Sequence, residues 1–153
     1  AALALVAAGF LVVASGGGGI PVVRDADGRL HGVEAVVDKD LSAALFAAAM
    51  AADVLVIATD VDAVYVDFDT PNARPLREAT PAVLRAHAAR GEFASGSMGP
   101  KVEAAARFIE GGGSRAVITS LDLIAEGVAG RAGTLVVPDL SDPSVQSALE
   151  SQR

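Results

Sequence analysis

Short apolar runs alternate with longer stretches of helical periodicity along most of this chain. The runs are rich in Val, Leu and Ile and are bounded by Gly or polar residues, which is typical of strands buried on both faces of a parallel sheet. They comprise residues 10–14, 53–58, 116–119 and 133–137. A hairpin over 22–33, turning at Asp27-Gly28, interrupts the series.

Helices are predicted between these strands, and each has a recognisable start. Asp38 and Thr80 are expected N-caps, Pro100 suits a first helical position, and Ser120 precedes a further helix. The predicted helices cover residues 39–52, 81–90, 100–110 and 121–128, and the chain opens inside a helix that ends at Gly9.

The order of elements predicts an α/β fold, a three-layer αβα sandwich with a mainly parallel sheet. We place this domain at residues 1–137 and expect a polar, loosely held tail at 138–153.

Composition narrows the function. The chain has 153 residues, 52% of them hydrophobic, and no cysteine, which excludes disulfides and thiolate metal sites. A net charge of −7 argues against a nucleic-acid partner. Residues 1–15 are apolar but too short to span a bilayer, and no basic segment precedes them, so we expect neither a membrane anchor nor a signal peptide. The first residue is Ala rather than Met, and we expect a fragment or a processed product.

Lysine is rare in this chain, which has two lysines against ten arginines. Lys39 follows the capping Asp38 and Lys101 follows Pro100, so both are predicted in the first turn of a helix, where the dipole favours anions. A cation there costs about 0.3–1 kcal/mol unless an anion joins it. A phosphate chain bridged by two ammonium groups accounts for both positions, and solvated lysines on ordinary helices are the alternative.

Glycines follow the first predicted strand, in Ser15-Gly16-Gly17-Gly18-Gly19. Such a strand end lets a ligand approach bare backbone. The segment is neither a Walker loop, since no Gly-Lys-Ser/Thr follows, nor a good dinucleotide fingerprint, because Pro21 stands at the third glycine position. A ligand loop and a flexible turn are the two interpretations.

Polar residues follow the second strand, where Thr59, Asp60 and Asp62 are expected at the carboxyl edge of the sheet. Aspartates also support turns through their own side chains, so turn and site remain equal alternatives. The two carboxylates do not form a metal cage, although they suit a magnesium ion that arrives with phosphates. We expect the two histidines, His31 and His87, at the surface.

Five segments now stand in a characteristic order: ASGGGGIPVV (14–23), GVEAVVDKDLSAAL (32–45), VIATDVDAVYVDF (56–68), FASGSMGPKVEAAARFIE (93–110) and AVITSLD (116–122). Together they resemble the C-terminal, nucleotide-binding half of the carbamate kinases, in the amino-acid kinase superfamily. The family's N-terminal half, with further phosphate- and carbamate-binding loops, is missing from this sequence. The resemblance therefore implies an incomplete enzyme unless a longer native chain supplies that half.

The resemblance implies phosphoryl transfer from ATP to carbamate, giving ADP and carbamoyl phosphate, in the cytoplasm and in arginine metabolism. It implies ATP or ADP with Mg²⁺ carried by the nucleotide, small-molecule substrates, no nucleic-acid or membrane partner, and a homodimer in the full-length enzyme. The implied catalytic residues are Lys101, Lys39 and Asp40. The implied nucleoside pocket comprises Thr59, Asp60, Tyr65, Ser97, Met98 and Gly99, and the loop of Ser15, Gly16, Gly17, Gly18 and Gly19 would face the acceptor.

Three alternatives remain open at this stage. Another superfamily kinase, acting on acetylglutamate, glutamate or uridylate, would share these nucleotide-binding segments. A module that binds nucleotide or forms a subunit interface without catalysis is a different class. A truncated chain with an exposed sheet edge is the third. For Met98 alone, an ordinary core position is as plausible as a pocket wall.

Overall fold

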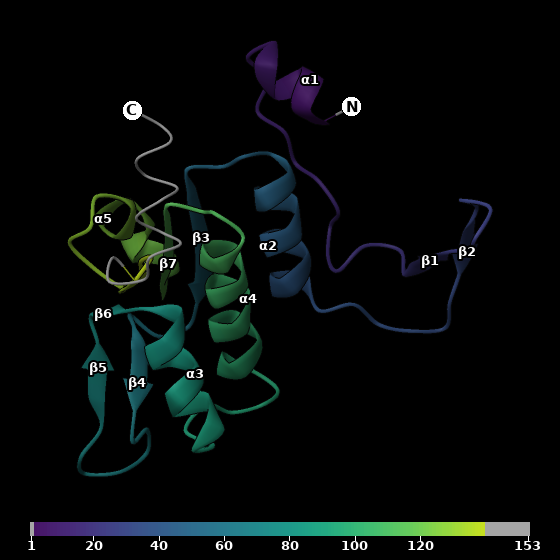
Figure 1. The fold of residues 1–153 in the computed structure, drawn as a ribbon. Coiled ribbons are helices and arrows are strands. Elements are labelled where there is room, and N and C mark those ends of the chain that lie inside the picture. The colour runs from purple at the N-terminus through teal and green to yellow at the C-terminus, as the bar shows by residue number, and fades with distance from the viewer. Residues whose placement is uncertain (1, 140–153) are drawn as a thin grey trace.

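The computed structural model describes residues 2–139, and a four-stranded sheet lies at its centre (Figure 1). The strand order is β3-β7-β8-β6, in which β3 pairs with β7 in parallel, β8 pairs with β7 antiparallel, and β6 pairs with β8 in parallel. Their bounds are β3 Val54–Thr59, β6 Glu78–Ala79, β7 Arg115–Ser120 and β8 Thr134–Val136. Two of the three pairings are parallel, as the sequence predicted.

Helices cover both faces of this sheet. Alternate residues of β7 divide between them: Ala116 and Ile118 join the core beneath α4, whereas Val117 faces Gly127 of α5. On the first face, α2 and α4 pack side by side and α3 packs on α4 (Figure 1). The helices are α2 Lys39–Ala49, α3 Pro81–Ala89, α4 Met98–Glu110 and α5 Ile124–Val128, the last preceded by a 3₁₀ turn at Leu121–Leu123. The three-layer αβα prediction is confirmed.

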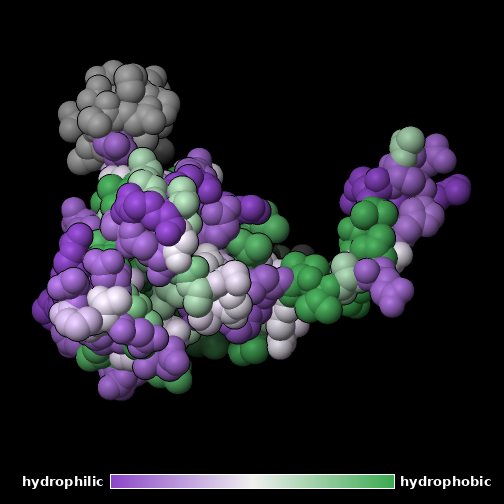
Figure 2. Space-filling view, turned by 90° about the horizontal axis from the view of Figure 1, so that it is seen from below, coloured by the Kyte–Doolittle hydropathy of each residue, from purple (hydrophilic) through white to green (hydrophobic). Residues whose placement is uncertain are grey.

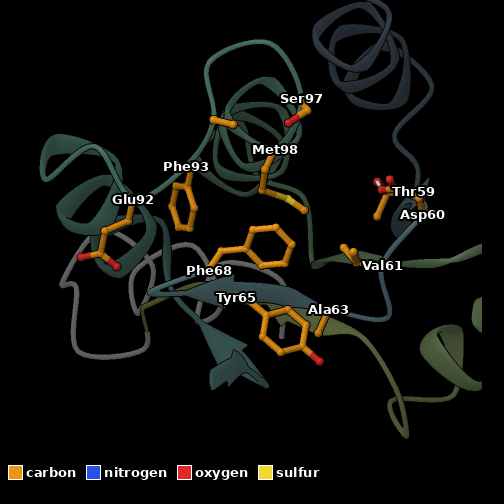
Figure 3. Close-up of a pocket in the computed structure, with 11 residues that line it drawn as sticks. Thr59, Asp60, Val61, Ala63, Tyr65, Phe68, Glu92, Phe93, Ser97 and Met98 are labelled. Atoms are coloured by element: carbon orange, nitrogen blue, oxygen red, sulfur yellow. Dashed lines mark hydrogen bonds between the residues drawn. The ribbon is translucent and has the colours of Figure 1, made fainter. Parts of the chain in front are cut away.

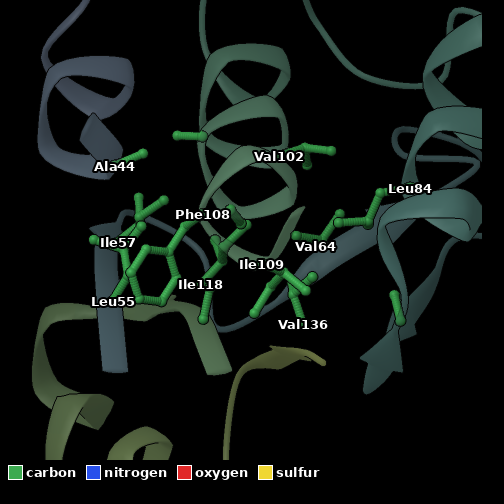
Figure 4. Close-up of a cluster of buried hydrophobic side chains, with 14 of the residues drawn as sticks. Ala44, Leu55, Ile57, Val64, Leu84, Val102, Phe108, Ile109, Ile118 and Val136 are labelled. Carbon is green, nitrogen blue, oxygen red and sulfur yellow. The ribbon is translucent and has the colours of Figure 1, made fainter. Parts of the chain in front are cut away.

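The hydrophobic core lies between α4 and the sheet (Figure 4). Phe108 is its largest fully buried side chain, and the apolar stripe predicted on this helix is buried at Val102, Ala105 and Ile109. A Cβ at Gly113 would lie 2.4 Å from the Phe108 ring, so the third residue after α4 has to be glycine for the ring to fit. The core therefore fixes where α4 lies, and with it the residues at its amino end.

Two hairpins accompany the sheet. The predicted one is present as β1 (Val22–Arg24) and β2 (Leu30–Gly32), with Gly28 at φ 82° in its turn. A second pairs β4 (Val64–Val66) with β5 (Arg74–Leu76) and was not predicted. Within this second hairpin Asp67 and Asp69 have positive φ, and the loop between them presents Phe68.

The strand predicted at 10–14 is wrong. After α1 (Ala2–Ala7) the chain runs extended and unpaired, with Leu11 93% and Val13 91% exposed. Figure 1 shows this segment and the β1–β2 hairpin lying apart from the sheet, and Figure 2 shows apolar side chains at the base of the projecting hairpin. An apolar run becomes a strand only when a neighbour accepts its backbone hydrogen bonds, and among the described residues none lies beside it.

Candidate functional site

The two lysines meet at one carboxylate. Asp38 caps α2 by accepting hydrogen bonds from the backbone N–H groups of Asp40 (2.8 Å) and Leu41 (3.1 Å). This start places Asp40 in the first turn, facing α4. Lys39 Nζ donates to Asp40 Oδ1 at 2.9 Å, and Lys101 Nζ donates to Asp40 Oδ2 at 2.8 Å. The packing of α2 on α4 therefore joins two cations that are 62 positions apart in the chain.

Burial differs sharply within this triad. The side chains of Asp40 and Lys101 are each 12% exposed, whereas that of Lys39 is 62% exposed. Burial is the largest single influence on the Asp40 pKa and raises it, but the hydrogen bonds and charges of Lys101 and Lys39 together outweigh it and hold that pKa below its usual value. The hydrogen bond to Asp40 raises the pKa of Lys39. An ammonium has three donors, so each lysine retains donors for an anion.

The helix that carries Lys101 begins two residues earlier than predicted, at Met98 rather than Pro100. Ser97 is its N-cap but makes no side-chain capping bond, and the Gly99 N–H donates to the Ala94 carbonyl at 2.9 Å. A Cβ at Gly99 would lie 3.1 Å from that carbonyl oxygen, so glycine lets the loop close against the helix. Lys101 consequently lies one turn after Ser97 and on the same face of α4.

A pocket opens beside this turn (Figure 3). It is a partly open hollow of about 160 Å³. The end of β3, the β4–β5 hairpin and the loop before α4 form its walls. Its lining residues are Thr59, Asp60, Val61, Ala63, Tyr65, Phe68, Glu92, Phe93, Ala94, Ser97 and Met98. Five of the six residues proposed for a nucleoside pocket line this space, and Gly99 does not.

Aromatic residues that the sequence analysis did not select line the pocket. Phe68, Phe93 and Met98 point toward one another across its interior (Figure 3). Phe68 is 54% exposed, and its ring centroid lies 6.1 Å from that of Tyr65. The sequence does contain a signal for Phe68. It stands between Asp67 and Asp69 in a polar loop, where burial in the hydrophobic core would not explain an aromatic residue.

The aspartates after β3 have mostly local partners. Asp60 accepts a hydrogen bond from Thr59 Oγ1 at 3.0 Å, and Asp62 accepts one from the Tyr65 hydroxyl at 2.9 Å and lies 3.7 Å from an Arg77 nitrogen. No group of three acidic or histidine side chains with metal-site spacing occurs in the described part of the chain.

The two histidines differ. His31 is 58% exposed, as predicted, and pairs with Asp25 on the hairpin. The surface prediction for His87 is wrong, because its side chain is 13% exposed and packs against the Phe93 ring with centroids 6.1 Å apart. The loop after α3 folds back over the end of that helix, and sequence periodicity gives no sign of this return.

The glycine loop lies against α2. The Gly18 carbonyl accepts a hydrogen bond from Ser42 Oγ at 2.6 Å, and a Cβ on Gly18 would lie 1.7 Å from the Val37 carbonyl oxygen. Gly16 and Gly19 have φ of 61° and 86°. Close approach of the backbone thus favours glycine at position 18, and a positive φ favours it at positions 16 and 19. The loop lies next to the helical turn that carries Lys39.

Sequence and structure comparisons identify relatives. The model of the amino acid kinase family matches residues 1–120. The carbamate kinase of Thermococcus kodakarensis is 48% identical over 87% of this chain and 42% of its own length, and that of Halobacterium salinarum is 49% identical over 88% and 43%. A carbamate kinase from Giardia lamblia bound to AMP-PNP superposes with a TM-score of 0.84 at 38% identity, over 90% of this chain and 48% of that one.

These relatives confirm the resemblance drawn from the sequence motifs, while the chain spans less than half the length of each of them. None of the helices in residues 2–139 has the length and apolar character needed to cross a bilayer. On the match that extends over residues 1–120, the chain belongs to the amino acid kinase family.

Proposed function

We propose that this chain carries the ATP- and ADP-binding part of a carbamate kinase. The observation that carries the proposal is the convergence of Lys39 and Lys101 on Asp40, one helical turn from the pocket. The carbamate kinases that match most of the chain support the choice of reaction, and the AMP-PNP bound to the Giardia relative supports the choice of nucleotide.

In the proposed reaction the bond between the γ-phosphorus and the β–γ bridging oxygen breaks, and a bond from that phosphorus to a carbamate oxygen forms. The products are ADP and carbamoyl phosphate. Negative charge is spread over the moving oxygens, so catalysis requires positioning and positive charge rather than covalent chemistry. Lys101 supplies charge to the transferring group, Lys39 supplies charge to the same phosphate chain, and Asp40 orients both ammonium groups.

The pocket accommodates the nucleoside in this proposal. Thr59, Asp60 and Tyr65 form one wall, and Ser97 and Met98 form the opposite wall. Phe68 offers a half-exposed aromatic face to a base, an interaction of about 1–3 kcal/mol in proteins that stack bases on aromatic rings. The loop from Ser15 to Gly19, beside α2, faces the acceptor.

Magnesium fits this arrangement as a companion of the nucleotide. The described residues hold no acidic cluster that would bind it alone, and Mg²⁺ usually keeps several waters and takes substrate phosphates as ligands. When bound, it would neutralise phosphate charge. A homodimer and a cytoplasmic location belong to the same proposal, as the family resemblance of the sequence motifs implies.

The test is ATP formation from carbamoyl phosphate and Mg-ADP by the full-length protein, compared with acetylglutamate, glutamate and uridylate as alternative phosphoryl acceptors in the forward direction. Carbamoyl phosphate turnover that Lys101→Ala abolishes supports the proposal. If the protein phosphorylates only one of the other acceptors, that acceptor and not carbamate is its substrate. Calorimetric binding of Mg-ADP with no turnover on any acceptor would favour a nucleotide-binding module.

A further inference from the structure

A charged cluster of His87, Arg90 and Glu92 lies behind one wall of the pocket. His87 is in the last turn of α3, Arg90 directly follows that helix, and Glu92 begins the loop that lines the pocket. Arg90 Nε donates to Glu92 Oε1 at 2.6 Å. In Figure 3 the Glu92 carboxylate points away from the pocket interior, whereas Phe93 faces it. Glu92 therefore borders the pocket while its carboxylate is directed toward Arg90 and His87.

One ring nitrogen of His87 has two incompatible neighbours. Its Nδ1 lies 2.8 Å from Glu92 Oε2 and 2.7 Å from Arg90 Nη2. A carboxylate oxygen only accepts hydrogen bonds and a guanidinium nitrogen only donates, so Nδ1 satisfies one of them at a time. With a proton Nδ1 donates to Glu92, and without a proton it accepts from Arg90. A fully protonated imidazole carries hydrogen on both nitrogens and is restricted to the first arrangement.

The charges around the cluster leave Glu92 as the anionic partner. Arg90 and then His87 lower the pKa of Glu92. α4 and β6 also pack against α3, but Glu103 and Glu110 of α4 are hydrogen-bonded to Arg85. On β6, Glu78 is exposed. Among the described residues, Arg90 and Glu92 are thus the charged groups that contact His87.

We propose that His87 is a positioning residue of the nucleoside pocket, whose protonation commits Nδ1 to Glu92, fixes the loop that carries Phe93, and strengthens nucleoside binding. This inference rests on the proposed function, because the pocket must accept a nucleoside. Charge-assisted hydrogen bonds are shorter and stronger than neutral ones, and the ring of His87 also packs on Phe93.

The experiment measures adenosine binding to the full chain by calorimetry from pH 5.5 to 8. Adenosine is chosen because the phosphates of ADP titrate in the same range. We expect binding about fivefold tighter at pH 5.5 than at pH 8, from the difference between a charge-assisted and a neutral hydrogen bond. His87→Gln binds adenosine with no such pH dependence. His31→Gln, a change at the exposed hairpin histidine, keeps the wild-type profile.

Proton uptake gives a second readout in the unmodified chain. Repeating the titration at each pH in two buffers of different ionisation enthalpy shows whether adenosine binding takes up protons, as linkage requires. Net uptake by wild type and by His31→Gln, but not by His87→Gln, supports the inference. Adenosine binding without uptake, or a pH profile unchanged in His87→Gln, overturns it and leaves the nucleoside pocket intact. No adenosine binding at any pH overturns both.

Discussion

Replacing Asp40 by Asn removes the charge between the two lysines while keeping the shape of the side chain. In the native structure one carboxylate accepts from Lys39 Nζ and from Lys101 Nζ. The amide of the variant offers one oxygen, so one ammonium loses its partner and neither retains a counter-charge at this position. The variant thus tests whether the triad is held by charge or merely by packing.

The expected cost follows from burial. Removing one partner of a buried ion pair costs about 3–5 kcal/mol, because the other charge remains desolvated. Asp40 and Lys101 are each 12% exposed, and the amide still accepts one hydrogen bond, so we reduce this to about 2–3 kcal/mol. Lys39 is 62% exposed and adds at most about 0.5 kcal/mol. For a chain of this size the loss corresponds to about 5–10 °C in melting temperature.

Urea unfolding at several pH values gives the assay. The folded-state pKa of Asp40 is held below its ordinary 3.8, so its contribution to stability is complete above about pH 5 and is lost as the pH falls through the folded-state value. Wild type and Asp40→Asn should therefore differ fully at pH 7 and converge below pH 3.8. Asp27→Asn, at the exposed hairpin tip, matches the change in net charge and should unfold like wild type at both pH values.

Equal stability of wild type and Asp40→Asn at pH 7 would refute the reasoning, as would a difference that persists undiminished at pH 3. Either result would mean that the lysine contacts contribute no net electrostatic free energy. The packing of α2 on α4 would then account alone for the position of these side chains.

Three further predictions concern separate parts of the molecule. Lys101→Ala in the full-length protein lowers ATP formation by about 10²–10³-fold, the usual cost of removing one transition-state charge contact, and wild-type turnover in a coupled ATP assay would contradict its role. Phe68→Ala weakens adenosine binding by at least about fivefold in calorimetry, because a stacking surface is lost. The far-UV circular dichroism spectrum stays unchanged, because the ring is half exposed and does not support the core. Unchanged adenosine affinity would exclude stacking on this ring. Arg85→Ala, which breaks the hydrogen bonds from α3 to Glu110 and Glu103 on α4, lowers the unfolding free energy by about 1 kcal/mol at low salt and less at 1 M salt; a salt-independent loss would point to packing instead.

Local signals predicted the centre of the site. The capping Asp38 fixes where α2 begins, and α4 carries Lys101 in its opening turn, so both lysines could be assigned to helix starts from a few neighbouring residues. The apolar stripe of α4 then predicted its buried face. The pairing of both lysines through Asp40 depends on how two helices pack, so the local pattern did not contain it, and only the family resemblance implied it.

Other features depended on segments distant in the sequence. The run at 10–14 has the composition of a buried strand, yet it is exposed because no described segment pairs with it. Phe68 was not selected because its pocket is completed by Phe93 and Met98, from another part of the chain. His87 was misjudged because Glu92 returns to it after a turn that helical periodicity does not register.

In the proposed function Lys39 and Lys101 bind one polyphosphate together. Calorimetry with ADP and with adenosine on wild type, Lys39→Ala, Lys101→Ala and the double variant tests it most directly. We expect each single change to weaken ADP binding by roughly tenfold, as for a charge-assisted contact, and the two effects to be non-additive. We expect adenosine to bind all four proteins alike. ADP affinity that is indifferent to both lysines, or adenosine affinity that falls as much as ADP affinity, would contradict it.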